Sequence, residues 1–184
     1  MSEIGRLIVL SGPSGVGKTT VVRHLRTHVP ELWVSVSATT RFPRPGETDG
    51  VNYLFVTDEQ FDRLVSDGDL LEWAAYAGHR YGTPHQPVDA VRQTGTPVLL
   101  EIEIDGARQV RSRVPDATLV FLAPPSQDVL VERLRGRGTE PDDVVASRLA
   151  RAEAEMSAAH EFDEVIVNDD LGAVVSRLVA LASD

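Results

Sequence analysis

The feature that most constrains the fold of this chain is a glycine-rich string between an apolar run and a helix-like segment. Residues 12–19 read GPSGVGKT and satisfy the pattern G-x-x-x-x-G-K-S/T at every position. An apolar run at 6–10 precedes the string, and Val21, Val22 and Leu25 give the segment after it an apolar helical face. In such a context a strand ends in a loop whose backbone N–H groups surround phosphate oxygens at the positive end of a helix. The chain is therefore predicted to bind ATP or GTP.

The polar residues of this string have separate predicted roles. Lys18 is expected to span the β and γ phosphates, and the Thr19 hydroxyl to ligate Mg²⁺, with phosphate and water completing the coordination. Lys18 is also the only lysine of the chain, and every other basic side chain is arginine. A compact ammonium on a flexible stem suits this position better than a wide guanidinium. The residues expected to contact the nucleotide here are Gly12, Pro13, Ser14, Gly15, Val16, Gly17, Lys18, Thr19 and Thr20.

Strand-like runs alternate with helix-like segments along most of the chain. Short apolar runs bounded by turn signals lie at 6–10, 97–103, 117–123 and 164–167, which is typical of strands buried on both faces. A later segment repeats apolar residues at helical spacing, at 145, 149, 152 and 156. The pattern predicts an α/β fold in which helices flank a parallel sheet. At 184 residues, one domain is expected.

The pattern changes between about residues 34 and 81. Strands there become shorter and more polar, as at 51–56, and prolines and glycines interrupt them. Thr57 and Gln60 have the spacing of a capping box for a short helix that Gly68 would end. These features predict an inserted lobe. A second glycine-containing excursion, at 135–143, is predicted to be a mobile turn before a helix.

Charge and composition exclude several classes of function. The 18 basic and 28 acidic residues give a net charge of −10, which disfavours a protein that binds long nucleic acids. The absence of cysteine excludes disulfide scaffolds, thiolate metal sites and cysteine nucleophiles, and it suits a reducing compartment. No leader-like start or membrane-length apolar run is present. We therefore expect a cytoplasmic protein with no membrane partner, while monomer and dimer both stay open.

Arginines at two places are suited to bind a second phosphate. Arg41 and Arg44 lie three residues apart on a proline-bounded segment of the predicted lobe, where they would clamp an acceptor phosphate. A second set lies beside glycines and would close as a lid over the transferring phosphoryl group: Arg133, Arg137 and Arg148. Arg151 alone is interpreted as a surface ion-pair residue. A phosphate acceptor is mostly a dianion near pH 7, since its second pKa is about 6, so no general base is needed.

Strings spread over nearly the whole chain resemble the guanylate kinases. They are residues 11–19 (SGPSGVGKT), 35–44 (SVSATTRFPR), 46–53 (GETDGVNY), 72–74 (EWA), 81–83 (YGT), 121–125 (FLAPP), 133–140 (RLRGRGTE) and 165–170 (VIVNDD). The resemblance implies a nucleoside monophosphate kinase of purine metabolism that uses ATP and Mg²⁺ to phosphorylate GMP, and dGMP as well. It also implies a core of residues 1–36 and 84–184, a GMP-binding lobe at about 37–83 and a lid at about 136–150.

The resemblance further assigns roles to individual residues. The implied catalytic residues are Lys18, Arg41, Arg137 and Arg148; the implied phosphate clamp for GMP is Arg41, Arg44, Tyr53 and Tyr81; and the implied guanine readers are Ser37, Glu72, Thr83 and Glu103. Arg133 and Arg137 are expected near the donor phosphates, and Asn168 near the adenine. Glu103 stands where the family often has aspartate, which leaves its partner open, whereas Thr19 and Thr83 keep the hydroxyl of the more frequent serine.

The chemistry of guanine supports this division independently. Guanine presents N1–H and N2–H₂ as donors, so a carboxylate such as Glu72 can accept two hydrogen bonds, while a hydroxyl of Ser37 or Thr83 donates to O6. Adenine lacks both donors and would leave the carboxylate unpaired. Two alternatives remain: a peptide-binding module that has lost catalysis, and a kinase for AMP, UMP or a modified purine. The intact Lys18 and the arginine set disfavour the first, and Glu72 with its hydroxyl partners disfavours the second.

Overall fold

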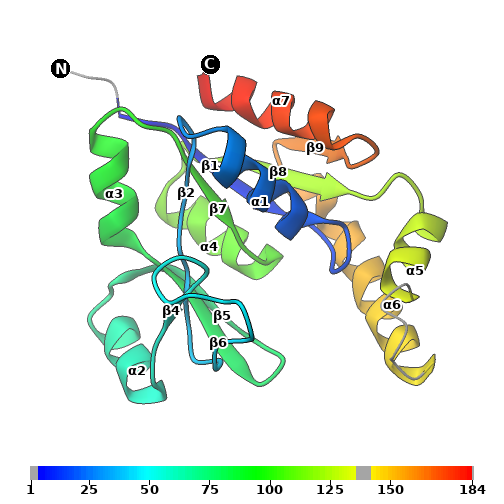
Figure 1. Ribbon diagram of the computed structural model, residues 1–184, viewed down its shortest axis with the longest axis horizontal. Coiled ribbons are helices and arrows are strands. Elements are labelled where there is room, and N and C mark those ends of the chain that lie inside the picture. Colours follow the sequence, from blue (N-terminus) through cyan, green and yellow to red (C-terminus); the bar gives the residue numbers. More distant parts are fainter. Residues whose placement is uncertain (1–3, 136–141, 184) are drawn as a thin grey trace.

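A five-stranded parallel sheet forms the centre of the structure, a computed structural model that describes residues 4–135 and 142–183. Its strands, in spatial order, are β2 (Trp33–Val34), β7 (Val98–Glu101), β1 (Leu7–Ser11), β8 (Thr118–Ala123) and β9 (Glu164–Val167). All neighbouring pairs run parallel (Figure 1). The predicted parallel sheet with flanking helices is confirmed, and the four apolar runs coincide with strands to within two residues at each end.

Helices cover both faces of this sheet because β1 alternates its side chains between them. Ile8 and Leu10 pack with α1 (Lys18–His28) and α7 (Leu171–Ser183) on one face. Leu7 and Val9 pack with α3 (His85–Gln93) and α4 (Ile104–Arg113) on the other face. These four β1 side chains are at most 1% exposed. Burial on both faces explains why the strand reads as a continuous apolar run.

A second sheet of four strands lies below the first one in Figure 1. Its spatial order is β4 (Leu54–Phe55), β3 (Ala38–Thr39), β6 (His79–Pro84) and β5 (Leu70–Tyr76), with β6 antiparallel to both of its neighbours. One face packs against α2 (Asp58–Ser66) through Ala38, Phe61 and Leu70. We call residues 38–84 the inserted lobe.

Local sequence signals in the inserted lobe were partly accurate. The capping box of α2 is present: Gln60 N–H donates to the Thr57 hydroxyl, and the Gln60 amide oxygen accepts from Thr57 N–H. Gly68 follows the helix with φ 75°, as expected of a helix-ending glycine. The predicted strand at 51–56 was too long, since the strand itself covers only Leu54–Phe55 and Tyr53 before it forms an isolated bridge with Asp49. The Asn52 side chain accepts from Thr48 N–H instead, so turn chemistry prevailed before β4.

Helix α4 of the core fastens the outer strand of the inserted lobe. The Gln109 amide bonds both backbone groups of Trp73, accepting from N–H at 3.1 Å and donating to C=O at 2.8 Å. Arg113 donates to the carbonyls of Leu70 and Leu71. An edge strand otherwise presents unpaired backbone groups, and these side chains satisfy several of them. Strand β5 is therefore held directly by the core.

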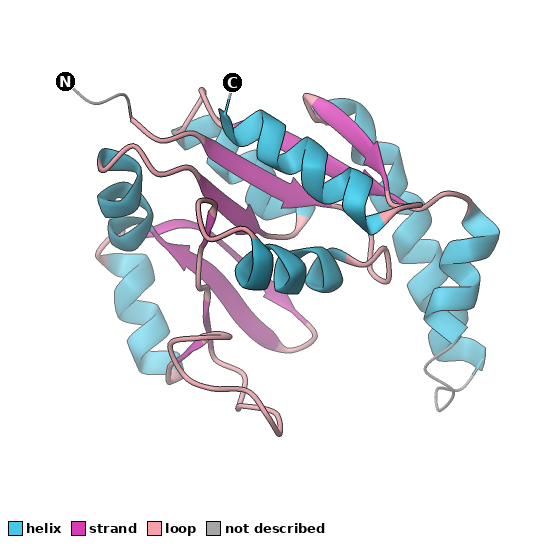
Figure 2. Cartoon of the chain, turned by 45° about the horizontal axis from the view of Figure 1, so that its top comes forward, coloured by secondary structure: helices cyan, strands magenta, loops and turns pink. Residues whose placement is uncertain are grey.

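Two further helices stand at the opposite end of the molecule from α2 (Figures 1 and 2): α5 (Gln127–Arg135) and α6 (Asp142–Ser157). They pack through Leu130, Leu134, Leu149 and Ala152, and the 3₁₀ turn η1 (Ala158–Glu161) follows α6. Of the predicted lid at 136–150, residues 136–141 lie outside the described part, and the remainder belongs to α6. No helix within the described ranges has the length and apolar content needed to cross a bilayer.

The inserted lobe should owe much of its stability to Phe61. This side chain is fully buried and packs edge-on against Trp73, with 6.2 Å between the ring centroids. The substitution Phe61→Ala should lower the free energy of unfolding by about 3–5 kcal/mol in urea titrations, because it leaves a cavity. Phe42 is 86% exposed and provides a matched control. Phe42→Ala should change stability by less than about 0.5 kcal/mol; equal effects of the two substitutions would contradict this account.

Candidate functional site

The glycine-rich loop joins β1 to α1 at the carboxyl edge of the core sheet. Gly12 has φ 146° and Gly17 has φ 107°, which glycine adopts without strain. A Cβ at Gly12 would lie 2.3 Å from the Leu122 carbonyl oxygen, and one at Gly17 would lie 2.6 Å from Asn168 Nδ2. Both glycines are thus required by close packing as well as by conformation. The loop ends at Gly17, the N-cap of α1, so the positive end of that helix faces the loop.

Lys18 and Thr19 open α1 and lie next to an acidic residue that sequence reasoning missed. Lys18 Nζ donates to the Gly12 carbonyl and lies 3.4 Å from the Pro13 carbonyl oxygen. The Thr19 hydroxyl donates to Glu101 Oε1 at 3.3 Å. Burial raises the pKa of Glu101, and the nearby Lys18 charge partly opposes that rise. The available signal was positional: Glu101 ends β7, the parallel neighbour of β1, so both strands deliver polar groups to one edge.

Asn168 and Arg133, both predicted to contact the nucleotide, form hydrogen bonds with the backbone of the loop. Asn168 Nδ2 donates to the Val16 carbonyl at 2.7 Å, and Arg133 Nη1 donates to the same oxygen at 2.9 Å. Arg133 also donates to the Asn168 carbonyl at 3.2 Å. Both side chains lie at the loop, where they brace its backbone. Arg137 lies outside the described residues, and Arg148 lies on α6 with a side chain that is not described.

The predicted phosphate clamp forms on the inserted lobe. Arg41 lies over the ring of Tyr53, with 5.3 Å from Cζ to the centroid, and the Tyr53 and Tyr81 rings are 6.0 Å apart. The structure therefore brings these three predicted residues together. Arg44 is exposed, and its backbone N–H donates to Glu47.

Glu47 is a second residue that sequence reasoning missed. Its carboxylate binds the Arg41 guanidinium at both ends, with two contacts of 2.9 Å. The hydrogen bond with Glu47 raises the pKa of Arg41 and lowers that of Glu47. This fork geometry is the one in which guanidinium binds carboxylate or phosphate. The clamp is thus formed and oriented by an internal carboxylate.

Glu72 and Thr83 face each other across strands β5 and β6. The Thr83 hydroxyl donates to Glu72 Oε1 at 2.7 Å. Glu72 is only 4% exposed, and Thr83 is fully buried. Burial raises the pKa of Glu72 to about 7, although the hydrogen bond from Thr83 opposes the rise. A Cβ on Gly106 of α4 would lie 2.4 Å from Glu72 Oε2, so this glycine leaves room for the carboxylate. The structure therefore has a buried hydrogen-bond acceptor at Glu72.

The other two predicted base readers lie at the ends of neighbouring elements. Ser37 is half-buried directly before β3, and its carbonyl accepts from Leu54 N–H at 2.9 Å. Glu103 is the N-cap of α4, and its charge contributes to the raised pKa of Glu72. Glu103 therefore lies close enough to influence Glu72 electrostatically.

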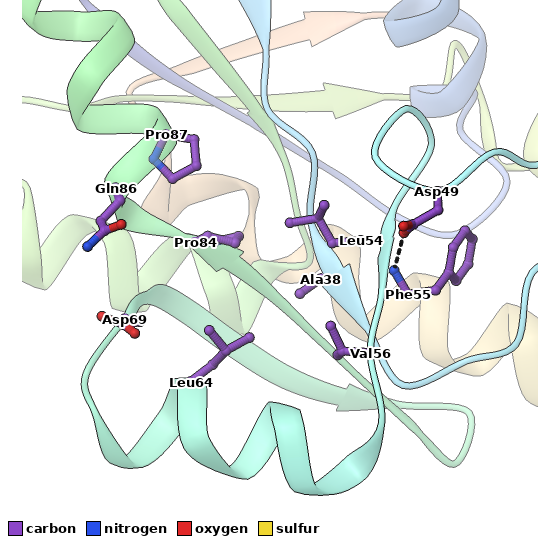
Figure 3. A pocket seen from close by; sticks show the side chains of 10 residues that line it. All are labelled: Ala38, Asp49, Leu54, Phe55, Val56, Leu64, Asp69, Pro84, Gln86 and Pro87. Atoms are coloured by element: carbon purple, nitrogen blue, oxygen red, sulfur yellow. Dashed lines mark hydrogen bonds between the residues drawn. The ribbon is translucent and has the colours of Figure 1, made fainter.

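A separate cavity of about 350 Å³ lies between α2 and the start of α3 (Figure 3). It is lined by Ala38, Asp49, Leu54, Phe55, Val56, Leu64, Asp69, Pro84, Gln86 and Pro87. Ala38 belongs to the face of the lobe sheet that packs against α2, whereas Lys18, Arg41 and Glu72 are absent from the lining. The residues that line this cavity are therefore different from those predicted to bind nucleotide at the loop and the clamp.

Comparison with known proteins gives one family. A sequence model of the family described as "Guanylate kinase" matches residues 4–183. The guanylate kinase of Streptomyces coelicolor is 59% identical over 178 residues, which cover 97% of this chain and 90% of that protein. The guanylate kinase of Frankia casuarinae is 61% identical over 95% of each chain. A crystal structure of guanylate kinase from Anaplasma phagocytophilum superposes with a TM-score of 0.80 at 32% identity, covering 99% of this chain and 86% of that one.

Glu72 should make stability depend on pH. Its pKa of about 7 exceeds the 4.5 of a free glutamate, so the folded protein keeps a proton that the unfolded chain releases. The resulting stabilisation is fully present below about pH 4.5 and is lost as pH rises through 7, by roughly 3 kcal/mol in total. Urea titrations at pH 5 and pH 8 should therefore show a larger loss for the wild type than for Glu72→Gln. Equal losses would remove Glu72 as the cause.

Proposed function

The chain belongs to the guanylate kinase family, and we propose that it transfers the γ-phosphoryl group of ATP to GMP, giving ADP and GDP. The observation that supports this most directly is the buried Glu72–Thr83 pair beside an arginine clamp. A phosphate-binding loop alone identifies a nucleotide-binding protein. An acceptor site for guanine, with a separate place for a phosphate, identifies which nucleotide receives the phosphoryl group.

ATP would bind at the loop between β1 and α1. Backbone N–H groups at 14–19 and the N-terminus of α1 would surround the phosphates, and Lys18 would exchange its contact with the Gly12 carbonyl for phosphate oxygens. The brace from Asn168 and Arg133 keeps the loop in shape from behind. Arg137 and Arg148 are proposed to reach the donor phosphates from the lid.

Mg²⁺ is proposed to bind at the same edge of the sheet. The Thr19 hydroxyl and the Glu101 carboxylate lie within 3.3 Å of each other, and oxygen ligands of this kind suit Mg²⁺. A positive ion would also stabilise the ionised form of Glu101, whose burial otherwise disfavours the charge. Phosphate oxygens and water would complete the coordination. When bound, the ion would neutralise charge on the donor phosphates.

GMP would place its phosphate at the clamp. The Arg41 fork already binds the Glu47 carboxylate at two points, and a phosphate offers the same kind of paired oxygens. Arg44 is exposed near Arg41 in the sequence and would supply a second guanidinium. The hydroxyl groups of Tyr53 and Tyr81 would offer further donors.

The base would be read by Glu72. A carboxylate accepts from both N1–H and N2–H₂ of guanine, and these donors would lower the cost of ionising a side chain whose pKa burial raises. Three further residues are proposed to complete the binding site for the base: Thr83, Ser37 and Glu103. Adenine offers no donor at N1 or C2, so binding AMP would leave the carboxylate buried and unpaired. Acceptance of dGMP is expected because the assigned contacts involve the base and the phosphate.

Catalysis then depends on positioning and charge. The GMP phosphate is already ionised near pH 7, with a second pKa of about 6, so it attacks without a general base. Lys18 and Arg41 hold the two reacting groups in place, and the proposed lid arginines would neutralise charge that develops between them. A binding module without catalysis would not need this set. The cytoplasmic location stays a prediction of the sequence.

A coupled assay of ADP release tests the proposal. Purified protein with ATP and Mg²⁺ should turn over GMP, and dGMP more slowly, while AMP, CMP and UMP should give little ADP. Activity should disappear with excess EDTA and return with Mg²⁺. Comparable rates for all five acceptors would overturn the assignment of GMP.

The substitution Glu72→Gln should damage GMP recognition selectively. An amide can accept only one of the two guanine donors, and its own NH₂ would face the other donor. The value of kcat/KM for GMP should fall about 10- to 100-fold, as for loss of a charged hydrogen bond. Glu59→Gln, at an exposed position of α2, is the matched control and should keep wild-type kinetics. Unchanged kcat/KM in Glu72→Gln would remove Glu72 from base recognition.

A further inference from the structure

A carboxylate from helix α6 contacts the phosphate-binding loop. Glu155 Oε2 accepts from the backbone N–H of Ser14 at 3.1 Å, although the two residues are 141 positions apart in sequence. The Glu155 side chain is 12% exposed. Ser14 follows Pro13, whose carbonyl lies 3.4 Å from Lys18 Nζ, so the contact is made at the end of the loop nearest the ammonium. Because Lys18 is proposed to span the β and γ phosphates, these phosphates would bind at this part of the loop.

The same carboxylate is tied to the inserted lobe. Glu155 Oε1 accepts from Arg151 Nε at 2.8 Å, one helical turn earlier on α6. The Arg151 guanidinium lies over the ring of Tyr76, with 4.5 Å from Cζ to the centroid. Tyr76 ends strand β5, at the hairpin that points toward α6 in Figure 1. Arg151 is thus more than the surface ion-pair residue expected from its sequence, because it joins α6 to the lobe.

The contact of Glu155 with Ser14 opposes the binding of a nucleotide phosphate at the loop, and the contact with Arg151 extends the effect to the inserted lobe. The loop N–H groups attract an anion, and in this arrangement Glu155 satisfies one of them. A phosphate oxygen and a carboxylate oxygen cannot share that N–H closely, since both are negative. ATP therefore has to displace Glu155. Displacement would also disturb the Arg151 contacts, because Arg151 holds Glu155 and Tyr76 together.

We propose that Glu155 is a positioning residue that occupies the place of a nucleotide phosphate at Ser14 until ATP displaces it. Arg151 links this displacement to the inserted lobe through its contact with Tyr76. The proposal rests on the proposed binding of ATP at this loop. It predicts that the wild type binds ATP more weakly than its loop alone would allow, because the apparent Kd equals the intrinsic Kd divided by the fraction of molecules in which Glu155 is undocked.

Calorimetric binding of ATP and ADP, with Mg²⁺ and without GMP, tests the proposal. Glu155→Gln keeps the shape of the side chain and an oxygen acceptor but removes the charge. The Kd for ATP should fall by roughly three- to tenfold, as expected if Glu155 is docked in most molecules. ADP should gain as well, because its β phosphate would reach the same end of the loop. Unchanged or weaker ATP binding would overturn the proposal.

Glu153→Gln is the matched control on the same helix. Glu153 is exposed and accepts from Gln127, away from the loop. Its substitution removes one negative charge and should leave both Kd values unchanged; a gain equal to that of Glu155→Gln would show a general charge effect and overturn the proposal.

A second pair of variants tests the link to the lobe. Tyr76→Ala should also lower the Kd for ATP, by a smaller factor, whereas Tyr76→Phe keeps the ring and should match the wild type. No change in Tyr76→Ala would overturn the link. Turnover of ATP and GMP by the wild type is measured in parallel. Failure of that turnover would count against the proposed function, whereas normal turnover with an unchanged Kd in Glu155→Gln counts against this inference alone.

Discussion

Two phosphate groups repel each other, and a protein that brings them together has to supply positive donors in fixed positions. This requirement governs where the few useful cations of an acidic chain are found. The core sheet presents one set of donors, the backbone loop and Lys18, at the edge where β1 ends. The inserted lobe presents the other set around Arg41. The net charge of −10 is irrelevant to these sites because only the local arrangement acts on a bound phosphate.

Carboxylates stand beside the donors at both places where a phosphate is proposed to bind. Glu47 binds the Arg41 fork at the clamp, while Glu155 contacts the Ser14 N–H and Glu101 contacts Thr19 at the loop. These carboxylates keep the donors oriented while no phosphate is present, which reduces the ordering that binding would otherwise require. Glu47 and Glu155 also impose a cost, because a phosphate would have to displace them, whereas the charge of Glu101 would be neutralised by the proposed Mg²⁺. Affinity is thereby reduced in return for a site that is already formed.

Sequence reasoning was most accurate where a local pattern determines a local structure. The strand, glycine loop and helix at 6–25, the capping box at Thr57 and the helix end at Gly68 follow from backbone preferences and short-range spacing. The predicted strand at 51–56 was wrong in length because side-chain hydrogen bonds within the turn competed with pairing. Sequence reasoning missed three glutamates of an acid-rich chain: Glu47, Glu101 and Glu155. Only Glu101 carried a local signal, its place at the end of an apolar run, and the other two resemble surface charges in their own neighbourhoods. Their importance comes from contacts across 6, 82 and 141 positions.

The attachment of the lobe would separate the proposed recognition of the base from the proposed binding of the phosphate. Glu72 lies on β5, between backbone groups that Gln109 and Arg113 of the core helix α4 hold in place. Arg41 follows β3, two strands away from β5 in the sheet order and without those attachments. Rigid support is most useful for Glu72, because a buried carboxylate discriminates guanine from adenine only if it cannot turn toward water. The clamp has to adjust as Glu47 gives way to a phosphate. Under the proposed function, one small sheet would therefore combine a fixed edge strand, β5, whose Glu72 would select the base, with the segment after the inner strand β3, whose Arg41 would accept the phosphate.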